Sequence, residues 1–335
     1  MTPVVALTSG DPAGIGLETA FKAWSHFSDQ DPFVLICDPD HAAETGQSLN
    51  LAMVRVGSPE AAGEAFSEGV PVLPVAFRNP ATPGSPDAGN ARNVLDTIRT
   101  AVECQRAGKV TAICTNPVSK SILKEGARFR YPGQTEFLTA LSGADSGIMM
   151  LCNGDFRVVP VTTHIALRDV PGRLTGKRIE RAIRVSEQAL KSDFRIGSPR
   201  IAVAGLNPHA GENGMMGHED IHLIQPIVAG LEAEGMAIRG PLPADSMFHA
   251  EARKSYDVAI CMYHDQALIP VKTVGMMHTV NVTLGLPFVR TSPGHGTAFD
   301  IAGQNRADER SLVEALKLAR RLAANRGTCS ERRDA

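Results

Sequence analysis

The stretch VVALTSGDPAGIG, residues 4–16, decides the fold class of this chain. Val4–Thr8 is a continuous, largely apolar run, which is typical of a strand buried on both faces of a parallel sheet. The glycine-rich turn that follows, residues 9–16, predicts a strand–turn–helix unit whose helix start is helped by Pro12. Similar runs recur along the chain, at Phe33–Cys37, Val110–Cys114, Ile148–Cys152, Val158–Thr162, Ile201–Ala204 and Val258–Met262.

Amphipathic helix patterns separate these runs. Val94, Ile98 and Val102 form an apolar stripe that ends at Gly108, a C-cap residue. Further stripes follow Ile179 and the capping box Ser311–Glu314, which predicts that a helix opens there. Strands and helices in alternation predict a doubly wound α/β fold. Residues 79–90 predict a loop, and the polar residues 325–335 predict a frayed tail.

Composition excludes several classes of protein. Of the 335 residues 43% are hydrophobic, enough for one large or two ordinary folded domains, although no linker marks a boundary. A net charge of −2 and 5% aromatics argue against a nucleic-acid partner or an anionic membrane surface. No run approaches the roughly 18 apolar residues of a membrane span, and the N-terminus lacks a signal pattern. The cysteines are scattered without CxxC pairs, which predicts reduced thiols in a cytoplasmic protein; they are Cys37, Cys104, Cys114, Cys152, Cys261 and Cys329.

Three histidines occupy equivalent places in the pattern. His164, His209 and His264 each follow a predicted buried strand. Because the carboxyl ends of parallel strands share one edge, the three imidazoles can converge there. Neutral imidazoles suit Zn²⁺, Co²⁺ or Ni²⁺, so the pattern indicates a metal site. The alternative is that each histidine satisfies an ordinary hydrogen-bonding role.

Three further segments indicate anion binding. Lys272, Asn281 and Arg290 lie on neighbouring segments and could hold a phosphate or carboxylate, the alternative being solvated strand ends. The glycine-rich loop of residues 292–303 can present backbone N–H groups to a nucleotide phosphate. The turn of residues 9–16 has the same capacity, or is simply a structural turn, since it matches neither GxGxxG nor a P-loop.

Eight motifs in order give the chain a specific resemblance. They are GDPAGIG (10–16), TNPVSK (115–120), PGQTEFL (132–138), GLNPHAGE (205–212), GPLPAD (240–245), YHDQALIPVK (263–272), NVTLGLPFVRTS (281–292) and HGTAFDIAG (295–303). Together they resemble the PdxA family, the 4-hydroxythreonine-4-phosphate dehydrogenases of pyridoxal phosphate (pyridoxine) biosynthesis. The last motif also resembles the cofactor loop of the isopropylmalate and isocitrate dehydrogenases.

The resemblance implies an architecture and an activity. It implies two α/β/α subdomains with largely parallel sheets, roughly residues 1–130 plus 280–335 on the cofactor side and 131–279 on the metal side. The active site is expected in the interdomain cleft and completed across a homodimer interface. The reaction implied is an NAD- or NADP-linked oxidation of 4-phosphohydroxy-L-threonine at C3, assisted by a divalent metal such as Zn, Mg or Co. Decarboxylation then gives 3-amino-2-oxopropyl phosphate.

The resemblance also assigns residues. It places the metal on His164, His209 and His264. It implies substrate contacts from Gln134, Thr135, Lys272, Asn281 and Arg290, and makes Asp245, Asp265 and Lys272 candidates for positioning or proton transfer. The cofactor side comprises Gly10, Asp11, Gly14, His295, Gly296, Thr297 and Ala298.

Three residues depart from the family pattern. Gln134 replaces the histidine of a GHTE tetrad, Gly294 an aspartate and Ala267 a glycine. Gln134 keeps a donor and an acceptor but cannot carry a charge, which leaves room for 4-phospho-threonate, 4-phospho-erythronate or a cis-dihydrodiol dicarboxylate as substrate. Two other classes compete: a phosphate-handling acyl- or phosphotransferase, and a non-catalytic metal- or metabolite-binding protein.

Overall fold

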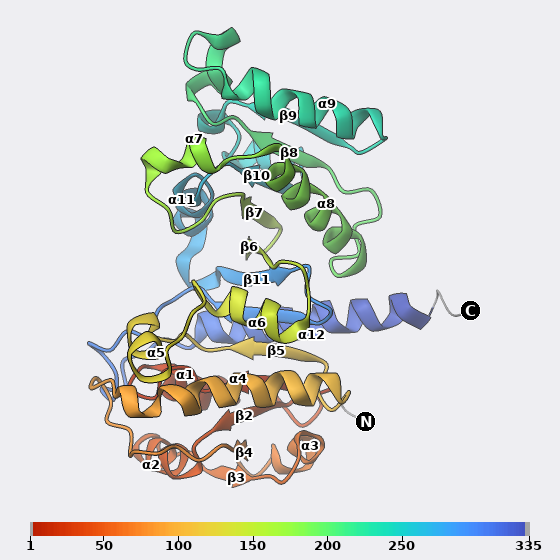
Figure 1. Ribbon diagram of the computed structural model, residues 1–335. Helices are drawn as coiled ribbons and strands as arrows, with labels where there is room; N and C mark the ends of the chain where they lie inside the picture. The colour runs from red at the N-terminus through yellow and green to blue at the C-terminus, as the bar shows by residue number, and fades with distance from the viewer. Residues whose placement is uncertain (1–2, 332–335) are drawn as a thin grey trace. The chain divides into compact units, whose positions relative to one another are not determined.

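The structure is a computed structural model that describes the backbone of residues 3–331 and the side chains of residues 3–327. It divides into two compact units (Figure 1). The first unit contains Met1–Gly147 and Leu286–Gly327, and Ile148–Gly285 is the continuous body of the second. Residues 131–147 therefore group with the first unit and residues 280–285 with the second.

The first unit is built on a fully parallel sheet with the strand order β3-β4-β2-β1-β5-β12. Its strands are β1 (Val5–Thr8), β2 (Phe33–Cys37), β3 (Met53–Arg55), β4 (Val70–Pro74), β5 (Ala112–Thr115) and β12 (Val289–Pro293). Its helices are α1 (Gly16–Trp24), α2 (Pro39–Leu49), α3 (Ala62–Ala65), α4 (Ala91–Arg106), α5 (Lys120–Ala127), α6 (Gln134–Ser142) and most of α12 (Arg310–Glu331). A core joins the inner faces of α4 and α6 to β2 and β5.

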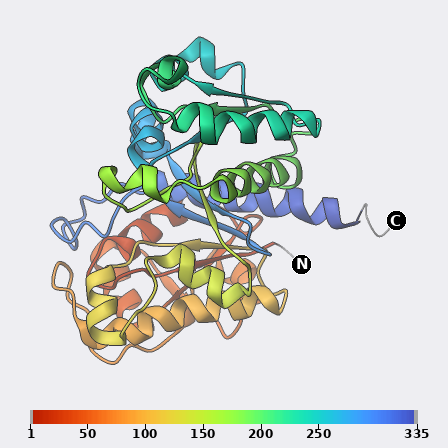
Figure 2. The ribbon, with the colours of Figure 1, turned by 45° about the horizontal axis from the view of Figure 1, so that its top comes forward.

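The second unit, coloured from yellow-green to light blue in Figure 2, has the strand order β11-β6-β7-β10-β8-β9. Its strands are β6 (Ile148–Asn153), β7 (Phe156–Pro160), β8 (Ile201–Ala204), β9 (Ile238–Leu242), β10 (Val258–Cys261) and β11 (Val280–Leu284). Its helices are α7 (Val170–Arg173), α8 (Gly176–Ser192), α9 (Gln225–Ala233), α10 (Ala250–Arg253) and α11 (His264–Gly275). β7, β10, β8 and β9 are parallel, and β6 is antiparallel to both of its neighbours.

The predicted α/β fold is confirmed, and every predicted apolar run overlaps a strand. The sequence patterns do not predict β3, β4 or β9. They also do not divide the segment of residues 280–293 into the two strands β11 and β12. The physical reasons are local. β3 is only half-buried, β4 contains two prolines, and β9 contains Gly240 and Pro241, residues that are disfavoured inside strands.

Three details of the sequence-based prediction are wrong. Ile148–Cys152 is not a parallel strand, because only Gly154 and Asp155 join β6 to β7 and so short a link requires an antiparallel pair. α1 begins at Gly16, so Pro12 lies in the turn before it. The predicted helix start at Ser311 is confirmed to within one residue, because α12 begins at Arg310. The Ser311 hydroxyl also accepts a hydrogen bond from Gly294 N at 2.9 Å.

The predicted frayed tail is the third detail that is wrong. Residues 325–331 continue α12, and residues 332–335 lie outside the described part of the chain.

None of the helices between residues 3 and 331 is long and apolar enough to cross a membrane. The five cysteines with described side chains carry free thiols, whereas the side chain of Cys329 lies outside the described residues. Burial raises the pKa of the Cys114 thiol to about 12, so this thiol is unreactive.

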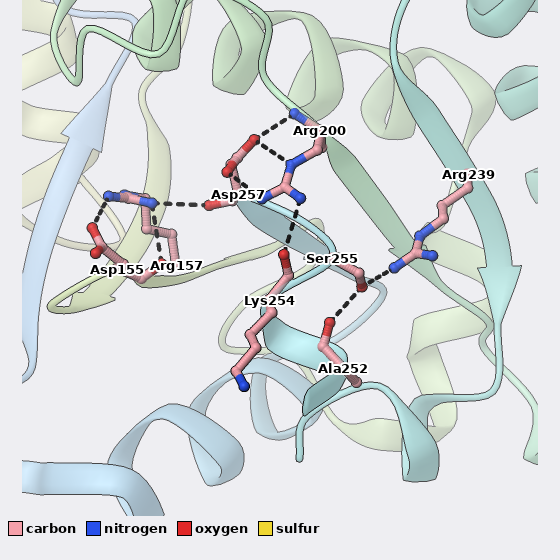
Figure 3. A network of polar contacts seen from close by, with 8 residues as sticks. All are labelled: Asp155, Arg157, Arg200, Arg239, Ala252, Lys254, Ser255 and Asp257. Atoms are coloured by element: carbon pink, nitrogen blue, oxygen red, sulfur yellow. Dashed lines mark hydrogen bonds and ion pairs between the residues drawn. The ribbon is translucent and has the colours of Figure 1, made fainter. Parts of the chain in front are cut away.

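An ionic network joins the amino ends of three strands in the second unit (Figure 3). Asp257, just before β10, accepts hydrogen bonds from the backbone N (2.7 Å), Nε (3.2 Å) and Nη2 (3.0 Å) of Arg200, just before β8. Arg157, on β7, donates to the Asp257 carbonyl at 3.2 Å and to the Asp155 carboxylate at 2.8 Å. Burial alone would raise the pKa of Asp257, but the bonds from Arg200 outweigh it and hold this pKa below its ordinary value.

Candidate active site

Two glycine-rich segments of the first unit lie against each other. Ile15 N donates to the Thr297 carbonyl at 3.0 Å, and a Cβ placed on Gly14 would lie 2.8 Å from the same oxygen. Gly10 has a φ of +75°, and a Cβ there would lie 2.5 Å from the Pro117 carbonyl. Side chains at either position would force the loops apart. The structure therefore brings the predicted cofactor residues Gly10, Gly14 and Thr297 together at the carboxyl end of β1.

The polar side chains of these segments shape the loops. Asp11 is 4% exposed and accepts a hydrogen bond from Ala13 N at 3.1 Å, and burial raises its pKa. His295 is half-buried, its Nδ1 lies 2.9 Å from the Gly296 carbonyl, and burial lowers its pKa. Gly296 itself is exposed, and Ala298 has a φ of +46°. Exposed backbone at this place can approach a phosphate closely.

Arg290 is a buried cation on β12 whose side chain reaches the carboxyl end of β5. It is 3% exposed, and its Nη2 donates to Thr115 Oγ1 at 2.6 Å and to Gln134 Oε1 at 3.2 Å. The other end of the Gln134 amide, Nε2, donates to the Asn116 carbonyl at 3.0 Å. Burial lowers the pKa of Arg290 to about 10, so the guanidinium stays charged at neutral pH. Gln134 thus holds Arg290 in place through a neutral bridge.

The first turn of α6 lies beside this cation. Gly133 is the N-cap, its residue type offers no side-chain cap, and Thr135 follows in the first turn. Lys120 Nζ lies 3.7 Å from a Cβ built on Gly133. Free N–H groups of a helix start, with a lysine and an arginine close by, can hold an anion. Thr115 and Lys120 both lie in the TNPVSK motif, but the sequence alone gave neither of them a role in the site.

In the second unit, the three predicted metal ligands follow adjacent strands. The order β7-β10-β8 puts the ends that precede His164, His264 and His209 side by side at one edge. The rings of His164 and His264 have centroids 5.6 Å apart. Asp265 Oδ1 lies 2.6 Å from Nδ1 of His264. The side chains of His164, His264 and Asp265 line a pocket of about 460 Å³, together with Thr162, Thr163, Ile165, Leu167, Val170 and Tyr263.

His209 is not among the residues that line the pocket of His164 and His264. It lies in the 3-10 turn Pro208–Gly214, and its φ of +51° puts it in the left-handed region, as does the φ of +55° at His164. Within the described residues, no three His, Cys, Asp or Glu side chains come close enough together to hold one ion. The donor set fits a divalent ion in type, since imidazole nitrogen suits Zn²⁺ or Co²⁺. Two of the three predicted ligands are adjacent.

The remaining predicted residues are distributed between the units. Lys272 is half-buried on α11, two turns after His264 and on the same face of that helix. Asn281 lies on β11, and its Oδ1 is buried with no hydrogen-bond partner among the described residues. Asp245 is exposed in the 3-10 turn Ala244–Ser246. Lys272 and Asn281 belong to the second unit and Arg290 to the first.

Comparison with known proteins identifies the family. Residues 29–319 match the family model described as pyridoxal phosphate biosynthetic protein PdxA. The chain belongs to the PdxA family. It is 48% identical to a 4-hydroxythreonine-4-phosphate dehydrogenase of Ruegeria sp. (strain TM1040), over 96% of this chain and 98% of that one. A solved 4-hydroxythreonine-4-phosphate dehydrogenase of Klebsiella pneumoniae is 34% identical with a TM-score of 0.84, over 96% and 99% of the two chains.

More distant structures delimit what the PdxA fold implies. A terephthalate 1,2-cis-dihydrodiol dehydrogenase of Burkholderia xenovorans is 31% identical with a TM-score of 0.64, over 97% of this chain and 98% of that one. An isocitrate dehydrogenase of Methylococcus capsulatus (15% identity, TM-score 0.50) and a branched-chain phosphotransacylase of Enterococcus faecalis (12%, 0.56) share only the fold. The fold alone therefore does not separate dehydrogenases from phosphotransacylases.

Proposed function

We propose that this PdxA-family protein oxidises 4-phosphohydroxy-L-threonine at C3 with NAD or NADP, and that the product loses CO₂ to give 3-amino-2-oxopropyl phosphate. The observation that carries the proposal is the pairing of His164 with the His264–Asp265 pair in one pocket. The chain that contains this pairing is 48% identical, over almost its whole length, to a 4-hydroxythreonine-4-phosphate dehydrogenase. Identity to the dihydrodiol dehydrogenase is lower, at 31%.

His264 is the residue whose chemistry follows most directly from geometry. A bond of 2.6 Å from its Nδ1 to the Asp265 carboxylate holds the proton on Nδ1. Nε2 then keeps its lone pair and points away from Asp265, available to a ligand or a proton. Asp265 therefore orients the ring. This arrangement suits a metal ligand, because Nε2 is the nitrogen that would bind the ion.

Arg290 is proposed to recognise an anionic group of the substrate. A permanently charged guanidinium in a dry environment interacts strongly with phosphate or carboxylate. Thr115 and Gln134 orient it, and the N–H groups at the start of α6 add partial positive charge. Lys272, Asn281 and Thr135 are proposed as further substrate contacts, with Asp245 as a candidate for proton transfer.

A nicotinamide and a divalent ion complete the proposal. Gly10, Gly14 and the loop that contains Thr297 are proposed to hold the phosphates of NAD or NADP, whose nicotinamide ring would supply the hydride acceptor. His164, His209 and His264 are proposed to bind the ion, which when present acts as a Lewis acid toward the C3 oxygen and the product ketone. Free cysteine thiols support a reducing cytoplasmic location.

The proposal includes a homodimer. The large apolar side chains that the described structure exposes all lie in the second unit; they are Ile165, Leu167, Met215, Met216, Ile269, Val274 and Met276. Exposed apolar groups of this kind mark interaction surfaces. Light scattering on the purified chain tests this part, with twice the monomer mass expected.

The activity is tested by following reduced nicotinamide with Co²⁺ present. 4-Phosphohydroxy-L-threonine is compared with its dephosphorylated form, 4-phospho-erythronate and a cis-dihydrodiol dicarboxylate. Turnover of the first alone is expected. Arg290→Lys keeps the charge but loses the paired contacts, so kcat/KM for the phosphorylated substrate should fall about ten- to a hundredfold. Arg184→Lys, on the exposed face of α8, is the control. Preferred turnover of the dihydrodiol would contradict the proposed substrate.

A further inference from the structure

A continuous chain of buried hydrogen bonds joins the three histidine-bearing strand ends of the second unit. Thr162 Oγ1 donates to the Met262 carbonyl at 2.8 Å. Met262 N donates to Gln266 Oε1 at 2.7 Å, and Gln266 Nε2 donates to the Gly205 carbonyl at 2.7 Å. The chain thus runs from the end of β7 through the end of β10 to the end of β8.

Each link lies close in sequence to one histidine. Thr162 precedes His164 by two residues, and Gln266 follows His264 by two. Gly205 precedes His209 by four. Thr162 is 3% and Gln266 8% exposed, so water does not readily replace these bonds.

Asp220 extends the chain beyond Gly205. Its carboxylate is fully buried and accepts bonds from Leu206 N at 2.7 Å and Asn207 N at 3.1 Å. A Cβ on Gly205 would lie 2.8 Å from Asp220 Oδ1, so the loop is wrapped closely around this carboxylate. Three successive residues before His209 are therefore held by side chains from outside their loop.

The histidines themselves need such support. His164 and His209 both have left-handed backbone conformations, which residues other than glycine keep only where the surrounding structure imposes them. The metal-ligand role proposed for these residues requires ring positions to be held within about 0.5 Å. A buried chain of short bonds between the three loops meets both needs.

We infer that Gln266 is a positioning residue, which together with Thr162 and Asp220 sets the spacing of the loops that carry His164, His209 and His264. The inference rests on the proposed function, because it takes these histidines as the metal ligands. Gln266 is suited to this place because one amide both accepts and donates. No carboxylate or ammonium of similar length does both when ionised.

The principal test is Gln266→Glu, which keeps the size and the acceptor for Met262 N but sets an oxygen against the Gly205 carbonyl. Co²⁺ binding is measured by visible absorption, well below the unfolding temperature of each protein. The dissociation constant is expected to rise about tenfold, since groups that support metal ligands typically change affinity ten- to a hundredfold. Gln188→Glu, on the exposed face of α8, makes the same chemical change and should bind Co²⁺ as the unmodified chain does.

A second pair of variants protects the test against misfolding. Thr162→Val removes the hydroxyl bond but leaves Thr162 N, which also reaches the Met262 carbonyl at 3.3 Å. It should weaken Co²⁺ binding about two- to fivefold, and Thr162→Ser should restore it. Unchanged Co²⁺ binding in both Gln266→Glu and Thr162→Val would overturn the inference while leaving the proposed function intact. Absence of Co²⁺ binding by the unmodified chain would overturn the proposed metal site and this inference together.

Discussion

The two ends of the same three strands in the second unit are held by different chemistry. At the amino ends of β7, β10 and β8, Asp257 and Arg200 form an ion pair that Arg157 extends. At the carboxyl ends, the neutral groups of Thr162, Met262, Gln266 and Gly205 form the links. The side chain of Arg200 is 51% exposed, whereas Gln266 is 8% exposed.

This contrast separates stability from function. Charged pairs are tolerated where solvent screens them and no ligand has to bind. At the carboxyl ends the links from strand to strand are neutral, while the carboxylates of Asp265 and Asp220 each hold a single loop beside a proposed metal ligand. The amino ends are therefore expected to affect folding alone, and the carboxyl ends activity.

The largest expected effect is at the carboxyl end. His264→Ala removes the imidazole that Asp265 orients, so kcat/KM should fall at least about a hundredfold. Because His264 is partly exposed, the free energy of unfolding should change by less than about 0.5 kcal/mol. Steady-state kinetics and thermal unfolding measure the two quantities. His222→Ala, at an exposed histidine of the same unit, should leave both unchanged.

A smaller effect is expected at the amino end, on stability alone. Asp257→Asn should lower the free energy of unfolding by about 1–2 kcal/mol at pH 7 and leave kcat/KM within twofold. The folded-state pKa of Asp257 is below its unfolded value, so its contribution is complete above about pH 4. The contribution is lost as the pH falls through the folded-state pKa.

Denaturant titrations between pH 3 and pH 7 test this pH dependence. The difference between the unmodified chain and Asp257→Asn should shrink on acidification. Asp155→Asn is the control, because the Asp155 side chain is fully exposed and its pair with Arg157 should contribute little. A loss of activity in Asp257→Asn without a loss of stability would remove the distinction between the two ends.

The smallest effect is expected at Gln134 in the first unit, where another neutral amide supports a site residue. A neutral imidazole in Gln134→His can accept from Arg290 and donate to the Asn116 carbonyl, as the amide does. At pH 8, kcat/KM should stay within about threefold. Protonation of that imidazole removes the acceptor for Arg290 and places an imidazolium beside the guanidinium, so kcat/KM should fall toward pH 6. A gain in kcat/KM at low pH would instead indicate that the substrate needs a cation there.

Local patterns predicted most of the elements and the ends on which the chemistry lies. Alternation of buried runs with amphipathic stripes predicted β1, β2, β5, β8 and β10, with α4 and α8 between strands. The places of His164, His209 and His264 after buried strands followed from the same pattern. The half-exposed or proline-containing strands β3, β4 and β9 gave no comparable signal, because their residues lack the apolar run on which the prediction depends.

Sequence by itself determined the α/β class, the strand-end histidines and the motifs that place the chain in its family. Tertiary structure alone decided that β10 lies between β7 and β8, which makes His264 the neighbour of His164. It also decided that Gln266 bridges two strand ends, that Asp220 is buried against the His209 loop, and that Gln134 supports Arg290. The physical reason is range. Helix and strand periodicity is set by residues a few positions apart, whereas these bonds join residues from 14 to 156 positions apart.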